Sequence, residues 1–232
     1  MNIKNHDNDT ALILGCRYNN YDIVEKLLQY GDIDINEKGE DSKTALIWAV
    51  NRENIKIIQL LLLHGADINT KDFYGMSPLS HACQSGNYTL VEFLLNQGAD
   101  INIKDNNYHG TTSLMWACKQ RNKYIVELLL KRGADIYLRD ECDKTCLIYA
   151  IVYGNNDIIK LLLSIGCDIN SKDIFGKTAL LYAIEDDLEE ITEILFNHGA
   201  NLLECDNYQR SVLDYIKDNE NKNILESYLK RI

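Results

Sequence analysis

The sequence predicts an all-α repeat solenoid, made of helix-turn-helix units that are joined by β-turn or hairpin fingers. Three observations predict it: a short triplet that recurs at an almost constant spacing, a glycine that recurs in step with it, and an apolar stripe between the two. Self-similarity at a period of roughly 20–50 residues is typical of arrays in which each unit packs only on its neighbours. The period therefore indicates the fold class before any single element is assigned.

The recurring triplet has Thr or Ser in first place and Leu in third place. Successive copies begin 34, 33, 35, 33, 33 and 33 residues apart. A hydroxyl in first place can cap a helix by accepting a hydrogen bond from a backbone N–H, and Pro78 stands where a helix tolerates proline. Each triplet therefore predicts the start of a short first helix. The copies are Thr10-Ala11-Leu12, Thr44-Ala45-Leu46, Ser77-Pro78-Leu79, Thr112-Ser113-Leu114, Thr145-Cys146-Leu147, Thr178-Ala179-Leu180 and Ser211-Val212-Leu213.

The recurring glycine follows a second apolar stripe, as in the segment from Ile125 to Leu130. Such a stripe predicts a second helix, and a glycine able to take the left-handed conformation is a common helix end. The polar, turn-rich residues that come next, such as DINTKDFYGMS, predict a finger that leads to the next unit. The glycines are Gly31, Gly65, Gly98, Gly133, Gly166 and Gly199.

This pattern resembles the ankyrin repeat, whose 33-residue unit carries a T-P-L-H-x-A signature, two helices and a β-turn finger. The likeness covers essentially the whole chain. The signature His is absent from every copy, and only Pro78 keeps the signature proline. The resemblance implies a single ankyrin-repeat domain over residues 1–232, with six full repeats and a C-terminal capping repeat. The expected bounds are 5–38, 39–71, 72–104, 105–139, 140–172, 173–205 and 206–232.

Composition narrows the partners and the compartment. A formal charge of −11 and a pI near 4.9 disfavour nucleic acid, which needs an excess of clustered Lys and Arg. No apolar run approaches the roughly 20 residues of a membrane span, so we expect no membrane insertion. The polar start lacks the apolar core of a signal peptide, and seven scattered cysteines suit a reducing compartment. We expect an intracellular, cytoplasmic protein, and these observations do not exclude the nucleus.

No constellation of catalytic or metal-binding residues stands out. The histidines occupy unrelated repeat positions, and Cys142 and Cys146 have no second pair at the spacing of metal ligands. Cys16, Cys83 and Cys118 share one inner position of the first helix and are interpreted as core residues. The sequence therefore predicts a protein that is not an enzyme and has no cofactor, metal site or small-molecule substrate.

An aromatic side chain stands two residues after most of the signature leucines. We call this place in the repeat the ring position. In an ankyrin-like stack it faces the concave side, and Trp and Tyr are enriched at binding hot spots. Two interpretations stay open: the rings line a peptide-binding groove, or they pack between neighbouring first helices. The ring position holds Leu14, Trp48, His81, Trp116, Tyr149, Tyr182 and Tyr215, of which Trp48, His81, Trp116, Tyr149 and Tyr182 are the candidate groove.

The finger tips form a second candidate surface. Aromatic rings on turns have little core to cover them, and exposed apolar groups often mark contact sites. The fourth finger is two residues longer than the third, so it either projects toward a partner or is a tolerated insertion. The tip candidates are Phe73, Tyr74, Asn107, Tyr108, His109, Phe175 and Tyr208.

The resemblance also implies a possible modification, because some ankyrin arrays are substrates of asparaginyl hydroxylases at the Asn of the G-A-D-[VI]-N turn. The matching positions are Asn69, Asn102 and Asn170. Asn is also a natural turn residue, and the turn alone explains its presence there.

These observations together predict a non-catalytic protein–protein interaction module that binds a protein or peptide on the concave groove and the finger tips. Two alternatives stay open. The chain is a structural fragment of a larger ankyrin scaffold, or it is an adaptor that recruits a target to a larger complex. Neither alternative requires chemistry of the chain's own.

Overall fold

The computed structural model describes residues 3–106, 110–218 and 222–231. Within these residues it has fourteen α-helices, one short 3₁₀-helix and no named β-strand, which confirms the predicted all-α repeat fold. The helices are α1 (Ala11–Arg17), α2 (Tyr21–Gln29), η1 (Glu40–Ser42), α3 (Ala45–Asn51), α4 (Ile55–Leu63), α5 (Pro78–Ser85), α6 (Tyr88–Asn96), α7 (Ser113–Lys119), α8 (Lys123–Lys131), α9 (Cys146–Val152), α10 (Asn156–Ser164), α11 (Ala179–Glu185), α12 (Glu189–Asn197), α13 (Val212–Asp218) and α14 (Lys222–Leu229).

Contacts divide the chain into two compact units, with the division passing through α7 and α8. Unit 1 comprises Met1–Trp116 with Glu127–Ala134, and unit 2 comprises Ala117–Val126 with Asp135–Ile232. A single domain over residues 1–232, with the repeat bounds given above, stays a prediction.

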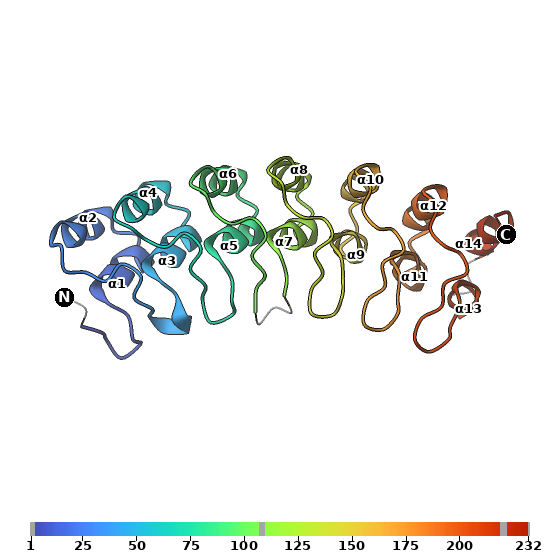
Figure 1. Cartoon of the computed structure of the whole chain (residues 1–232), viewed down its shortest axis with the longest axis horizontal. Helices are drawn as coiled ribbons and strands as arrows, with labels where there is room; N and C mark the ends of the chain where they lie inside the picture. The colour runs from blue at the N-terminus through green and yellow to red at the C-terminus, as the bar shows by residue number, and fades with distance from the viewer. Residues whose placement is uncertain (1–2, 107–109, 219–221, 232) are drawn as a thin grey trace. The chain divides into compact units, whose positions relative to one another are not determined.

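Unit 1 has its first helices and its second helices in two separate rows (Figure 1). Helix α3 contacts both α1 and α5, and α2 contacts α4 in the other row. The fingers that precede α3 and α5 extend away from the row of second helices (Figure 1). The first helices and the fingers therefore share one surface of the unit, which we call the finger face.

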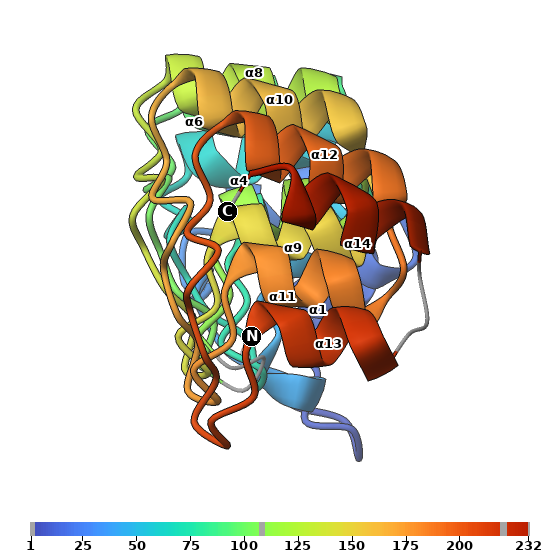
Figure 2. The same ribbon diagram turned by 90° about the vertical axis from the view of Figure 1, so that its right-hand side faces the viewer.

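Unit 2 repeats this arrangement. Helix α11 contacts α9 and α13, while α12 contacts α14. Figure 2 shows α10, α12 and α14 in one row and α9, α11 and α13 in the other, with the fingers on a common side. The finger face of unit 2 is built from the same repeat positions as that of unit 1.

The predicted caps are confirmed at the start of the first helices and after the second helices. The hydroxyl of Thr44 accepts a hydrogen bond from the N–H of Ile47, and the other described caps of first helices do the same. Each recurring glycine has a positive φ, for example +93° at Gly65. The second helices bring a feature that the sequence analysis missed, because an asparagine caps most of them through its side-chain oxygen. These caps are Asn20, Asn54, Asn87, Asn122 and Asn155.

The core is a continuous set of apolar side chains inside each unit. The inner positions of the first helices are buried, and the cysteines predicted to be core residues, Cys16, Cys83 and Cys118, are fully inaccessible. Burial raises the pKa of the Cys16 thiol to about 12 and also raises the pKa of the other two. These thiols are therefore unreactive at neutral pH.

Neighbouring fingers approach closely, and glycine makes this possible at two tips. Gly75 and Gly176 both have positive φ. A Cβ at Gly176 would lie 2.7 Å from the backbone nitrogen of Asn207, and one at Gly75 would collide with the backbone of Asn106. At these two tips, a residue with a side chain would push the neighbouring fingers apart.

Candidate functional site

One buried aspartate organises most of the fingers, and we call these residues the finger aspartates. In finger six, one oxygen of Asp173 accepts hydrogen bonds from the N–H groups of Phe175 (2.9 Å) and Lys177 (2.8 Å). This pattern of donors two and four residues later closes the turn and recurs at Asp72, Asp140 and Asp206. The finger aspartates are Asp72, Asp105, Asp140, Asp173 and Asp206, and each is at most 5% exposed.

The other carboxylate oxygen of each finger aspartate contacts the polar tip of the residue at the ring position. The hydroxyl of Tyr182 donates to Asp173 at 2.7 Å, and the indole N–H of Trp116 donates to Asp105 at 2.5 Å. The remaining pairs are His81 with Asp72 (2.9 Å), Tyr149 with Asp140 (2.9 Å) and Tyr215 with Asp206 (2.8 Å). The ring position therefore holds each finger against the helix that follows it.

These contacts place the candidate groove residues. Trp116 is 2% exposed and belongs to the core, whereas Trp48, His81, Tyr149 and Tyr182 are half-buried on the finger face. The polar atoms of four of these side chains bind finger aspartates of the protein itself: His81, Trp116, Tyr149 and Tyr182. For these four, the packing interpretation accounts for the polar tip. The groove interpretation stays open for His81, Tyr149 and Tyr182, whose side chains are only half-buried.

Trp48 differs from the other rings. Its finger has Gly39 where the first finger has Asn5 and the five later fingers have an aspartate. The buried indole nitrogen of Trp48 has no hydrogen-bond partner among the described residues. The carboxylate of Asp9, from the preceding finger, lies against Gly39 and accepts the N–H of Glu40 at 3.0 Å. The second finger is therefore organised from outside the repeat, and its ring is not anchored in the same way.

Cationic side chains cover several of the rings. Lys43 lies 5.0 Å from the centre of the Trp48 ring, and Lys177 lies 5.4 Å from that of Tyr182. Lys144 and Arg210 occupy the same place in their repeats and cover Tyr182 and Tyr215 respectively. A cation over an aromatic face is attractive, so these lysines and arginines are held on the finger face.

Two finger aspartates, Asp105 and Asp206, have pKa values shifted in opposite directions. Burial raises the pKa of Asp105 to about 6, and the hydrogen bonds from Trp116 and Ser80 offset this only in part. The pKa of Asp206 instead lies below its ordinary value: burial opposes ionisation, but the backbone N–H of Arg210, the Tyr215 hydroxyl and the Arg210 side chain stabilise the anion. One repeat position thus carries two different electrostatic environments.

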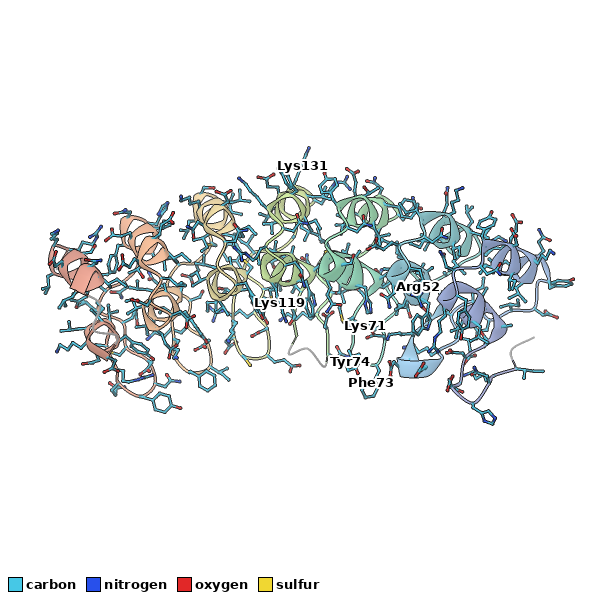
Figure 3. All side chains as sticks on the ribbon, turned by 180° about the vertical axis from the view of Figure 1, so that it is seen from behind. Arg52, Lys71, Phe73, Tyr74, Lys119 and Lys131 are labelled. Carbon is cyan, nitrogen blue, oxygen red and sulfur yellow. The ribbon has the colours of Figure 1, made fainter. Side chains whose placement is uncertain are left out.

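The finger tips expose aromatic rings. Phe73 is 61% exposed and Tyr74 is 37% exposed, and in unit 2 Phe175 and Tyr208 are 44% and 70% exposed. Figure 3 shows Phe73 and Tyr74 at the end of the third finger. Asn107, Tyr108 and His109, which were also tip candidates, lie outside the described residues.

A ladder of long cations along the fingers was missed by the sequence analysis. Lys38 donates to the carbonyl of Lys71 at 2.8 Å, and Lys71 donates to that of Lys104 at 2.9 Å. Lys4, Arg139 and Lys172 likewise each donate to a backbone carbonyl in the next repeat. The constant repeat position of these residues was a signal that could have revealed the ladder.

Two of the three asparagines considered for hydroxylation, Asn69 and Asn170, connect neighbouring repeats. The side-chain oxygen of Asn69 accepts the N–H of Asp100 at 2.9 Å, and that of Asn170 accepts the N–H of Asn201 at 2.8 Å. The backbone N–H of Asn102 donates to Asp100. Their turn role is evident, and hydroxylation stays a prediction.

The finger face of unit 1 contains an open hollow of about 450 Å³ between α3, α5 and the third finger. It is lined by Lys43, Val50, Asn51, Asp72, Tyr74, Met76, His81, Gln84 and Ser85. Among the described residues, no group of His, Cys, Asp and Glu side chains is arranged to hold a metal ion. No described helix is long and apolar enough to cross a membrane.

Comparison with known proteins places these features in a family. The model of ankyrin repeats (3 copies) matches residues 1–72, 32–105, 73–140 and 147–230. A putative ankyrin repeat protein of Fowlpox virus, FPV031, is 39% identical over 77 residues, and one of Rickettsia bellii is 39% identical over 61 residues. The aligned parts cover 33% and 26% of this chain, and only 22% and 34% of those curated relatives.

Two solved structures have a similar fold. The ankyrin repeat domain of Bcl-3, described as a unique member of the IkappaB protein family, superposes with a TM-score of 0.83 and is 25% identical. The superposition covers 97% of this chain and 100% of the Bcl-3 chain. The human ASB11 ankyrin repeat domain gives a TM-score of 0.79 at 24% identity, covering 97% and 98% of the two chains.

Proposed function

Because the chain belongs to the ankyrin repeat family, we propose that it is a non-catalytic interaction module that binds a protein or peptide on its finger face. Ankyrin repeat domains are generally protein–protein interaction modules, and the fold is typically non-catalytic. We take the finger face, rather than the row of second helices, as the binding surface because of what is exposed there.

The observation that carries the proposal is the recurrence of exposed rings at the finger tips. Tyr74, Phe175 and Tyr208 occupy one repeat position, two residues after the finger aspartate, and all are exposed. The row of second helices also exposes apolar side chains, such as Leu63. The residues equivalent to Leu63 in later repeats are polar: Asn96, Lys131, Ser164 and Asn197. A surface that repeats one kind of exposed side chain suits an extended partner.

The test is capture of a partner from lysate of the native source. The face variant carries Phe73→Ala, Phe175→Ala and Tyr208→Ala, which remove side chains that are 61%, 44% and 70% exposed. The matched control carries Leu63→Ala, Tyr88→Ala and Tyr124→Ala on the second helices, where exposure is 77%, 42% and 72%. Circular dichroism first establishes that both are folded.

We expect the wild type and the control to capture the same partner and the face variant to lose it. Exposed substitutions of this kind cost little stability, so loss of the partner reports on the surface. Loss in the control with retention in the face variant would contradict the proposal.

A second candidate function is a structural part of a larger ankyrin scaffold or adaptor. It is favoured by the length of the relatives, of which the chain covers 22% and 34%. An immunoblot of native lysate tests it, because a scaffold role requires an antibody against this chain to detect a much larger polypeptide.

A further inference from the structure

The finger face of unit 1 carries a cluster of cations around Trp48. Arg17 lies 4.8 Å and Lys43 lies 5.0 Å from the centre of the Trp48 ring. Arg52 follows at the end of α3, where its Nε donates to the carbonyl of Arg17 at 2.7 Å. This cluster stands out in a chain whose formal charge is −11.

The cluster is held in place before any partner arrives. Arg17 is fixed by the carboxylates of Asp9 (2.9 Å) and Glu40 (2.8 Å). Lys43 pairs with Asp41 at 3.3 Å, but the Asp41 side chain is 45% exposed, and exposed pairs of this kind are exchanged at little cost. Arg52 is exposed, and its Nε donates to the backbone carbonyl of Arg17 rather than to a carboxylate. The side chains are thus positioned while part of their charge is available.

The neighbouring hollow continues this surface with hydrogen-bond donors. The hollow is lined by Lys43, Asn51 and Gln84, whose ammonium group and two side-chain amides can donate hydrogen bonds to a ligand. Its lining carboxylate, Asp72, is occupied by the N–H groups of Tyr74 and Met76 and by the His81 ring. The hollow therefore offers hydrogen-bond donors to a ligand, while the Asp72 carboxylate is already hydrogen-bonded within the protein.

The end of one first helix in unit 2, α11, has the opposite character. The ends of α1, α3 and α5 present Arg17, Arg52 and Gln84 on the finger face. One carboxylate follows Arg52, that of Glu53, and it accepts a hydrogen bond from the side-chain amide of Asn87 at 2.9 Å. The end of α11 presents Glu185, Asp186 and Asp187, of which Glu185 pairs with Lys177 at 2.6 Å. Charge complementarity fixes the register of a partner, so an acidic ligand is attracted to unit 1 and repelled by the end of α11.

From these features we propose that the finger face of unit 1 binds an extended acidic segment of a protein. The segment places carboxylates against Arg17, Lys43 and Arg52 and runs over α3 into the hollow beside α5. Its backbone or side-chain carbonyls accept hydrogen bonds from the amides of Asn51 and Gln84. This inference rests on the proposed function and specifies the partner's chemistry.

The experiment measures the binding of a fluorescein-labelled peptide of repeating Gly-Ser-Glu to the full chain by fluorescence anisotropy. The Gly-Ser-Gln and Gly-Ser-Lys counterparts show whether the negative charge is what is recognised. The key variant is Arg52→Glu, because Arg52 is exposed and its replacement leaves the core intact. Its matched control is Lys131→Glu, the same charge reversal on an exposed residue of unit 1 at the end of α8, in the row of second helices (Figure 3).

We expect the glutamate peptide alone to bind, and its affinity to fall about tenfold or more between about 50 mM and about 500 mM salt. Arg52→Glu weakens binding about tenfold, whereas Lys131→Glu leaves it unchanged. Equal binding of the glutamate and glutamine peptides, or equal effects of the two variants, overturns the inference.

The partner captured in the earlier experiment separates this inference from the proposed function. A partner that Arg52→Glu retains and the Phe73, Phe175 and Tyr208 variant loses leaves the proposed function standing and overturns the acidic segment. A partner lost by Arg52→Glu and kept by Lys131→Glu supports both.

Discussion

Trp48 and Trp116 occupy the same repeat position, two repeats apart in unit 1, yet they make different contacts. The indole of Trp116 is 2% exposed and donates to the buried Asp105, whereas the buried indole nitrogen of Trp48 has no hydrogen-bond partner among the described residues. One ring anchors a finger, and the other forms the floor of a cation cluster. A repeat position therefore has a structural role where the finger aspartate is present and is open to another role where it is absent.

The largest expected effect compares the two tryptophans directly. Trp116→Ala removes a fully buried ring and leaves Asp105 without one donor, so we expect a loss of about 3–5 kcal/mol in unfolding free energy. Trp48→Ala removes a half-buried ring without such a bond and should cost about 1–2 kcal/mol. Urea unfolding of both variants measures this difference, and equal losses would refute the distinction.

The next effect concerns the finger aspartate itself. Asp173→Ala leaves the N–H groups of Phe175 and Lys177 and the hydroxyl of Tyr182 without their acceptor. We expect a loss of about 2–4 kcal/mol, because unsatisfied buried donors keep their desolvation cost. The exposed Asp186→Ala should change the unfolding free energy by less than about 0.5 kcal/mol. Thermal unfolding followed by circular dichroism compares the two, and similar shifts would show that Asp173 is not an organiser.

A third comparison uses pH. The pKa of Asp105 is about 6 in the folded protein, above its ordinary value of 3.8, so the folded state binds a proton more readily than the unfolded state. The contribution of Asp105 to stability is therefore greatest at low pH and is lost as the pH rises through about 6. We expect the wild type to gain about 1–3 kcal/mol relative to Asp105→Asn between about pH 7 and about pH 4.

The reverse sign holds at Asp206, whose pKa is lowered in the folded state. Its contribution is present above pH 3.8 and is lost as the pH falls through its folded pKa. Urea unfolding of Asp105→Asn and Asp206→Asn across this range measures both. Parallel pH profiles for the wild type and Asp105→Asn would contradict the account of Asp105.

The smallest effect concerns a single hydroxyl. Tyr149→Phe keeps the ring but removes the donor to Asp140, which should cost about 0.5–1.5 kcal/mol. Tyr124→Phe changes an exposed ring on α8 and should have no measurable effect. Equal stability of the two variants would mean that the ring, rather than its polar tip, makes the contribution.

The sequence predicted the regular parts of the fold because they repeat. The caps at Thr44 and Ser77 and the glycine after each second helix follow from local backbone requirements, and the structure confirms them. The roles of the finger aspartates were not predicted, although these aspartates recur once per repeat, as the ring position does. Their importance depends on burial and on where the ring tip lies, which a pattern of residue types does not reveal.

The ring position shows the same limit. Sequence periodicity identified Trp48 and Trp116 as equivalent, and the difference between them comes from Gly39, nine residues before Trp48. The significance of that glycine is visible only once the preceding finger supplies Asp9 in its place. Contacts between repeats therefore modify a prediction that treats every repeat alike.

Hydrogen–deuterium exchange of the chain with and without its captured partner tests the central claim most directly. The account predicts protection in the fingers and first helices, such as residues 71–85 and 173–185, with unchanged exchange in α4, α6 and α10. Protection confined to α4, α6 and α10, with unchanged fingers, would contradict it.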